Sequence, residues 1–260
     1  MAQAFAQERQ ARILAELRQR GRVEVAALAV LLDVSEDTVR RDLRALSEAG
    51  HLHKTHGGAV LLDTARMGWT TRADVAAAAK KAIAEAAVAV VRPGDVLMLD
   101  GGSTVLAFAT ALEVRPVTVV TNSLDIARVF DADPDVDLTL TGGQWDRDSR
   151  ILTGSAAVRS LGRHRADWAV LGACALDPDV GATSVNPADA DVKTAMAEAS
   201  RRTAVLADVT KHGHVEPHLV LTPDRIDLVV TDDAEASARW RERNVDVLTA
   251  PGAQSANAAR

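Results

Sequence analysis

One stretch of ten residues decides how the N-terminal part of the chain folds: Val34-Ser35-Glu36-Asp37-Thr38-Val39-Arg40-Arg41-Asp42-Leu43. Ser35 is a favoured helix N-cap, and Val34 and Val39 are placed as a hydrophobic staple. We predict a helix from residue 36 to about residue 49, where Gly50 is a favoured C-terminal cap.

The faces of this helix differ in a way that suits DNA binding. Val39, Leu43 and Leu46 share one face, and Arg41 and Arg44 lie roughly opposite them at about 100° per residue. Arginine side chains suit phosphate oxygens and the acceptor edge of guanine. The alternative is a charged, solvated helix face, and the elements around the helix argue against it.

Two helices are predicted to precede this one. Apolar residues recur at helical spacing over residues 11–17, before Gly21, and again over residues 25–32. Residues 51–61 have the pattern of two short strands around a Gly-Gly turn, which is typical of a wing. Residues 1–61 are therefore predicted to be a winged helix-turn-helix domain of α+β class. Its candidate DNA-binding residues are Ser35, Asp37, Thr38, Arg40, Arg41, Arg44, Lys54 and His56.

The charge distribution is compatible with this prediction. The whole chain has a net charge of −6, but residues 1–60 hold nine Lys/Arg and eight Asp/Glu, and the other 200 residues hold 21 and 28. Local basic clusters decide whether a DNA phosphate is attracted at contact range. An N-terminal head of net charge +1 on an acidic body can therefore still bind DNA.

Histidine and cysteine residues give no sign of a metal site. His51, His53 and His56 lie close together, but no Cys or Asp partner is near them, so we expect surface or backbone-contacting histidines. Cys174 is the only cysteine and is interpreted as a small buried hydrophobe. We expect no metal and no cofactor.

We expect a cytoplasmic protein. One thiol cannot form an internal disulfide, which fits a reducing compartment. The apolar runs at residues 25–32 and 86–91 are too short to span a bilayer, and the N-terminus lacks the pattern of a signal peptide.

The remaining chain is predicted to be an α/β layered domain. Residues 62–72 show no periodicity and are predicted to be a linker, and an alanine-rich helix follows over residues 73–91. Apolar strand-like segments then alternate with helix-like ones, which indicates a mostly parallel sheet covered on both faces. The domain is expected to span residues 73–250, and residues 251–260 are expected to be disordered. The candidate strands are residues 95–99, 117–121, 136–140, 168–172, 204–207, 228–231 and 245–248. The candidate helices are residues 104–112, 124–129, 156–161, 190–199 and 234–243.

Polar residues follow three of these strands at the end where α/β sheets bind ligands. Glycines allow close approach of backbone N–H groups to an anion, and a helix N-terminus adds a positive dipole end. Each group alone is also compatible with an ordinary turn or cap. The three groups are Asp100-Gly101-Gly102-Ser103-Thr104, Thr121-Asn122-Ser123 and Thr141-Gly142-Gly143.

Three further residues complete the candidate ligand site. Lys211 follows an apolar strand and is predicted to be a charge partner for an anion. Lys193 is a second candidate, with a solvated helix residue as the alternative. Asp177 can bind a sugar hydroxyl or form a turn before Pro178.

Both parts of the chain resemble the DeoR family of bacterial regulators. In the head, the run 34–43 and His56-Gly57-Gly58-Ala59-Val60 carry the resemblance. In the body, it is carried by residues 99–104, 119–124, 140–143, 193–196 and 208–213. The resemblance implies that Thr38, Arg40, Arg41 and Arg44 face DNA. It also implies a sensor domain similar to ribose-5-phosphate isomerase, in which residues 101–104 bind the phosphate of a phosphorylated sugar and Lys211 makes a further anion contact. His212 departs from the family's commoner Asp-Ser-Ser-Lys-Phe pattern, which leaves the effector open.

An enzyme is the main alternative function. The isomerases that the body resembles carry Asp-Gly-Ala-Asp-Glu and Lys-Gly-Gly-Gly stretches, and this chain has neither. The sequence therefore lacks the pattern that would supply a general base beside the substrate of such an isomerase. We therefore predict a regulator without enzymatic activity rather than a sugar-phosphate isomerase-like enzyme with a fused DNA-binding head.

The expected mechanism is repression that a ligand relieves. A short recognition helix binds weakly alone, so we expect a homo-oligomer, a dimer or a tetramer, on double-stranded operator DNA. A phosphorylated sugar is expected to release the protein from DNA by binding the body. An activator or a dual regulator of carbohydrate genes is an open alternative.

Overall fold

The computed structural model describes residues 2–48, 52–61 and 67–251. The chain divides into two compact units, Met1–Asp63 and Thr64–Arg260. Among the described residues, no helix combines the length and the apolar character that crossing a membrane requires.

The N-terminal unit is a winged helix-turn-helix. Its antiparallel sheet has the order β1-β3-β2, so the wing contains one strand, β1, that was not predicted. The predicted N-cap at Ser35 is confirmed, because its Oγ accepts a hydrogen bond from Thr38 N at 3.2 Å. The predicted end of the third helix, at residues 49–50, lies outside the described residues. The elements are α1 (Ala2–Arg20), β1 (Arg22–Glu24), α2 (Val25–Leu32), α3 (Glu36–Glu48), β2 (Leu52–Thr55) and β3 (Gly58–Leu61).

The C-terminal unit is built on a seven-stranded sheet in which every pairing is parallel. The prediction of an α/β layered fold is therefore confirmed, and each predicted strand position holds a strand. In sheet order the strands are β15 (Asp246–Thr249), β14 (Leu228–Thr231), β12 (Ser200–Leu206), β9 (Ala166–Gly172), β4 (Val96–Leu99), β5 (Val117–Thr121) and β6 (Val136–Leu140).

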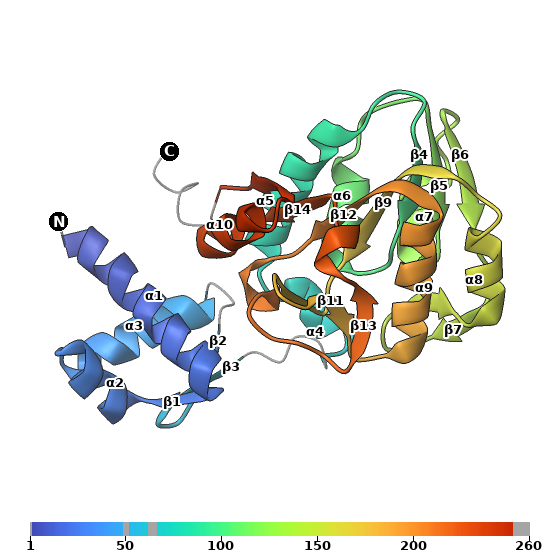
Figure 1. Ribbon diagram of the computed structural model, residues 1–260. Helices are drawn as coiled ribbons and strands as arrows, with labels where there is room; N and C mark the ends of the chain where they lie inside the picture. Colours follow the sequence, from blue (N-terminus) through green and yellow to red (C-terminus); the bar gives the residue numbers. More distant parts are fainter. Residues whose placement is uncertain (1, 49–51, 62–66, 252–260) are drawn as a thin grey trace. The chain divides into compact units, whose positions relative to one another are not determined.

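Helices cover both faces of this sheet (Figure 1). One face is packed by α5 (Ala77–Ala87), α6 (Ser103–Ala111) and α7 (Leu124–Phe130), which bury Ile83, Phe108 and Phe130. The other is packed by α8 (Ser155–Leu161), α9 (Pro187–Glu198) and α10 (Ala234–Glu242), which bury Leu161, Met196 and Trp240. Three 3₁₀ turns, η1 (Val88–Val90), η2 (Val209–Lys211) and η3 (Pro223–Arg225), join these elements.

The strand order creates a switch point. The chain runs from β4 outward to β5 and β6, returns to β9 on the other side of β4, and continues outward through β12, β14 and β15. At such a point the connections after two neighbouring strands diverge to opposite faces of the sheet, and a crevice opens between their carboxyl ends. The crevice between β4 and β9 is therefore the expected ligand position.

Two small antiparallel sheets lie outside the predicted elements. One has the order β10-β11-β13, from β10 (Ala175–Asp177), β11 (Gly181–Ser184) and β13 (His218–Leu221). The other is a hairpin of β7 (Gln144–Asp146) and β8 (Ile151–Thr153). These strands have three or four residues and were not recognised from the sequence, because so short a segment gives little alternation to detect.

The structure corrects two predictions for the segment around the boundary between the units. The predicted linker at residues 62–72 is wrong in part, because helix α4 (Trp69–Asp74) begins inside it. The single helix predicted over residues 73–91 is also wrong, since Ala76 has a left-handed backbone (φ +53°) and separates α4 from α5. Residues 62–66 and the predicted disordered tail from residue 252 lie outside the described residues.

Candidate functional site

A pocket lies at the switch point between β4 and β9. Residues 100–104 line it after β4, and residues 172–174 line it after β9. Residues 184–186 and Lys193 close another side from β11 and α9. The seven predicted effector residues brought together here are Asp100, Gly101, Gly102, Ser103, Thr104, Lys193 and Lys211.

The loop after β4 is shaped for close approach to a ligand. Gly102 has φ +116°, and a Cβ on Gly101 would lie 2.1 Å from Ile151 Cγ2, so neither position accepts a larger residue without strain. Helix α6 starts at Ser103, and the Leu106 N–H donates to Gly102 O at 2.9 Å. The backbone N–H groups before Leu106 in the first turn have no acceptor within the helix, and they lie at the positive end of the helix dipole.

Besides Lys193, three cationic residues line the pocket from separate parts of the chain. Lys211 comes from η2, Arg72 from α4 and Lys80 from α5. Lys80 is 4% exposed, and its Nζ donates to the Arg72 carbonyl at 2.5 Å. Burial lowers the pKa of Lys80 to about 8; Asp208 raises this pKa, and Lys211 and Arg72 lower it further. Two neighbouring cations thus disfavour the charge of Lys80, and a bound anion would favour it.

Sequence analysis missed Arg72 and Lys80. Arg72 lies in the segment that was predicted to be a linker. Lys80 is three, four and seven residues before Ile83, Ala84 and Ala87, which are all buried. The sequence thus places Lys80 in the apolar stripe of its helix, and this unusual position could have identified it as a candidate site residue.

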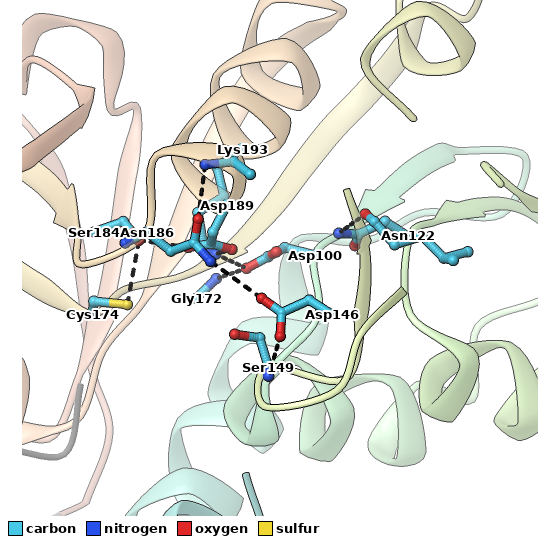
Figure 2. A network of polar contacts seen from close by, with 12 residues as sticks. Asp100, Asn122, Asp146, Ser149, Gly172, Cys174, Ser184, Asn186, Asp189 and Lys193 are labelled. Carbon is cyan, nitrogen blue, oxygen red and sulfur yellow. Dashed lines mark hydrogen bonds and ion pairs between the residues drawn. The ribbon is translucent and has the colours of Figure 1, made fainter. Parts of the chain in front are cut away.

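A buried ion cluster of Asp100, Asp189 and Lys193 also lines the pocket (Figure 2). Lys193 Nζ lies 3.2 Å from Asp100 Oδ2 and contacts Asp189 Oδ1. Asp100 Oδ2 also accepts from Gly172 N at 3.0 Å, and Ser184 Oγ donates to Asp189 Oδ2 at 2.7 Å. Burial raises the pKa of Asp100 to about 6. Burial lowers the pKa of Lys193, but the two carboxylates outweigh burial and the pKa is raised.

The other seven predicted effector residues do not line this pocket. Thr121 Oγ1 donates to Leu99 O at 2.7 Å, Asn122 Nδ2 donates to Leu152 O at 3.2 Å, and Ser123 caps α7 by accepting from Ile126 N. These three residues join neighbouring segments of the fold, as ordinary caps and turns do.

The remaining three positions and Asp177 also have local contacts. Thr141 Oγ1 donates to Gly142 O, and a Cβ on Gly143 would lie 2.5 Å from Thr153 O, so these residues fit the β7–β8 hairpin closely. Asp177 Oδ1 accepts from the backbone of Asp179 and Val180, which is the turn that sequence analysis kept as an alternative.

The predicted DNA-contacting residues are accessible, on α3 and on the wing of the N-terminal unit. Thr38 is half-buried, and the other seven are exposed: Ser35, Asp37, Arg40, Arg41, Arg44, Lys54 and His56. Arg40 pairs with Glu36 at 2.6 Å and Arg41 lies 3.7 Å from Asp37. Exposed pairs of this kind are weak, so DNA phosphates can compete for both arginines.

Asp42, a buried residue of α3 next to Arg41 in the sequence, was not predicted to have a role. Asp42 is buried, and its carboxylate accepts from Arg9 Nε at 2.5 Å and from Arg9 Nη2 at 3.0 Å. This bidentate pair ties α1 to α3 and fixes the position of the helix that carries the arginines.

Among the described residues, no group of three His, Cys, Asp or Glu side chains is placed to hold a metal ion.

Comparison with known families assigns both units. Residues 9–65 match the model of the DeoR-like helix-turn-helix domain, and residues 75–233 match that of the DeoR C terminal sensor domain. Together the two models cover most of the chain. They confirm the prediction of a DNA-binding regulator in place of an enzyme.

Curated relatives agree with this assignment. The chain is 30% identical to the "Putative aga operon transcriptional repressor" of Escherichia coli O157:H7 over 249 residues, 93% of each chain. It is 31% identical to the "Glycerol-3-phosphate regulon repressor" of Haemophilus influenzae, covering 78% of this chain and 80% of the relative. It is 34% identical to the "L-fucose operon activator" of the same organism, covering 76% and 81%. A solved ribose 5-phosphate isomerase from Methanocaldococcus jannaschii is a distant structural match, with a TM-score of 0.38, 18% identity and coverage of 51% of this chain and 53% of the isomerase.

Proposed function

Because the chain belongs to the DeoR family of transcriptional regulators, we propose that it binds operator DNA and that a phosphorylated sugar in the pocket between β4 and β9 weakens this binding. The observation that carries the proposal is the convergence of three cationic side chains and the α6 N-terminus on one pocket. Such a combination favours an anion with several oxygen atoms.

The effector's phosphate is assigned to the side of the pocket formed by residues 101–104, Arg72, Lys80 and Lys211. Backbone amides of α6 and the Ser103 hydroxyl supply donors there, and the cations supply charge. A relative named for a glycerol-3-phosphate regulon is consistent with a phosphorylated effector.

The sugar hydroxyls are assigned to the side formed by Asp100, Ser184, Asn186 and Asp189. Lys193 is already held by two carboxylates, so this side offers hydrogen-bonding groups in place of free positive charge. A few fixed polar groups of this kind orient a ligand in its pocket.

Operator recognition is assigned to α3 and to the wing. Ser35, Thr38, Arg40, Arg41 and Arg44 are proposed to contact bases and phosphates in the major groove, with Asp37 at the same surface. Lys54 and His56 are proposed to contact the DNA backbone from β2 and the turn after it.

The wider context is also part of the proposal. Residues 1–61 form the DNA-binding domain, and residues from α4 to position 250 form the sensor domain. The protein acts in the cytoplasm as a homo-oligomer, since two linked recognition helices bind DNA far better than one. It represses carbohydrate genes. One relative is named as an activator, so a measurement of transcription with and without the protein is needed to distinguish repression from activation.

The test is fluorescence anisotropy on labelled DNA from upstream of the protein's own gene, at one stated salt concentration. A panel of sugar phosphates is added, each beside its unphosphorylated sugar. We expect salt-sensitive binding of the DNA, reversed by one phosphorylated compound and unaffected by the same sugar without phosphate. Release by the unphosphorylated sugar alone would contradict the assigned phosphate position, and no response to any compound would contradict the effector proposal.

A further inference from the structure

Helix α4 forms part of the pocket and lies next to the connection between the two units. It covers Trp69–Asp74, and residues 62–66 precede it in the chain. Its residue Arg72 lines the pocket. An isolated helix of six residues is not stable in water, so the position of α4 depends on its contacts with the sensor unit.

The N-terminal end of α4 is held by the loop between β7 and β8. Trp69 N donates to Asp148 O at 3.3 Å, and the Trp69 ring lies 5.1 Å from the Arg150 guanidinium carbon. Two hydrogen bonds to Asp125, at 2.7 and 2.6 Å, fix Arg150 in place. Trp69 itself does not line the pocket between β4 and β9.

The C-terminal end of α4 is held by Lys80. The Lys80 ammonium group donates to the Arg72 carbonyl at 2.5 Å, in the last turn of α4, and it also lines the pocket. The Arg72 side chain lines the same pocket from α4 itself. One bound anion can therefore contact the helix directly through Arg72 and indirectly through Lys80.

Burial disfavours the charged form of Lys80 most, Asp208 and Asp74 favour it, and the neighbouring cations Lys211 and Arg72 disfavour it. The charged form is the one that holds the Arg72 carbonyl most strongly. A phosphate group between the three cations would turn this repulsion into shared attraction.

We propose that Lys80 and Arg72 make α4 an effector-tightened clamp: an anion in the pocket fixes α4, the first helix of the sensor unit, against the rest of that unit. The inference rests on the proposed function only in placing an anion at this site. The coupling is reciprocal, so loosening α4 from its other end must weaken anion binding.

The experiment is hydrogen exchange of the full-length protein with inorganic phosphate as the probe, against sodium chloride at equal ionic strength. We expect phosphate to slow exchange at residues 101–106 and, by roughly three- to tenfold, at residues 69–74. Lys80→Met should abolish the response of residues 69–74. Lys81→Met is the matched control, because Lys81 is an exposed neighbour paired with Glu85, and it should respond as the wild type does.

Trp69→Ala provides a second, independent readout. Trp69 does not line the pocket between β4 and β9, yet this change should weaken phosphate binding by about three- to tenfold, the range expected from loss of a cation–π contact. Unchanged phosphate affinity in Trp69→Ala would overturn the clamp.

The outcomes separate the clamp from the proposed function. Slower exchange at residues 101–106 with no change at residues 69–74 would overturn the clamp and leave the anion site standing. A response of residues 69–74 that survives Lys80→Met would also overturn it. No effect of phosphate at either segment would contradict both the clamp and the anion site.

Discussion

Two buried carboxylates, Asp100 and Asp189, share the ammonium group of Lys193. Sequence analysis predicted Lys193 as a charge partner for the effector, with a solvated residue as the alternative. The structure gives it a third role, because Asp189 lies four residues earlier on the same helix, and the predicted helix began one residue too late to include this pair. The charge of Lys193 is thus directed mainly at the protein's own carboxylates.

Lys193→Met should destabilise the protein strongly. The substitution keeps the length of the side chain but leaves two carboxylates buried without their common partner, which costs about 3–5 kcal/mol in comparable buried pairs. Urea denaturation followed by circular dichroism measures the free energy of unfolding. Lys81→Met is again the control, and its expected effect is within about 0.5 kcal/mol. Equal stability of the two variants would show that the ion cluster does not hold the pocket together.

At the scale of elements, sequence alone predicted the regular parts well. Most of the seven strands of the parallel sheet contain continuous apolar runs, and Ser35 and its flanking residues mark the recognition helix by local capping chemistry. These signals depend on a few neighbouring residues, so they can be recognised without the fold. The helix α4 was missed because its six residues contain no full amphipathic repeat.

The pocket was predicted only in part, for a related reason. Residues 100–104 and Lys211 follow strands, and the rule for strand ends found them. The same rule also selected residues 121–123 and 141–143, which follow β5 and β6, away from the β4–β9 switch point. The order of strands in a sheet is set by long-range packing, and a sequence pattern does not state it.

The two functional elements, α3 and the N-terminal end of α6, should be separable by mutation. Arg41→Ala should weaken operator binding by about 1–3 kcal/mol and leave effector affinity unchanged. Ser103→Ala removes a hydroxyl assigned to the phosphate and should weaken effector binding by ~1.5–3 kcal/mol, with operator affinity unchanged. Anisotropy with labelled DNA and calorimetry with the effector measure the two affinities. Loss of both activities in either variant, with an unchanged melting temperature, would contradict the assignment.

At the scale of the molecule, the account joins a DNA-binding unit and a sensor unit in one thermodynamic cycle. A ligand shifts an equilibrium only through unequal affinity for the two states. The acidic sensor unit carries most of the negative charge, and the N-terminal unit carries the three exposed arginines of α3, Arg40, Arg41 and Arg44. The proposed clamp places one end of this coupling at α4, the first helix of the sensor unit.

The most direct test of this coupling is calorimetric titration of the identified sugar phosphate into the protein, once free and once saturated with operator DNA. If the effector weakens DNA binding by a given factor, the DNA must weaken effector binding by the same factor. We therefore predict that the Kd of the effector is higher for the DNA-bound protein than for the free protein. The ratio of these two Kd values should equal the ratio of the Kd values for DNA, with and without effector, that anisotropy measures. The same Kd in both titrations would contradict the claim that this sensor controls DNA binding.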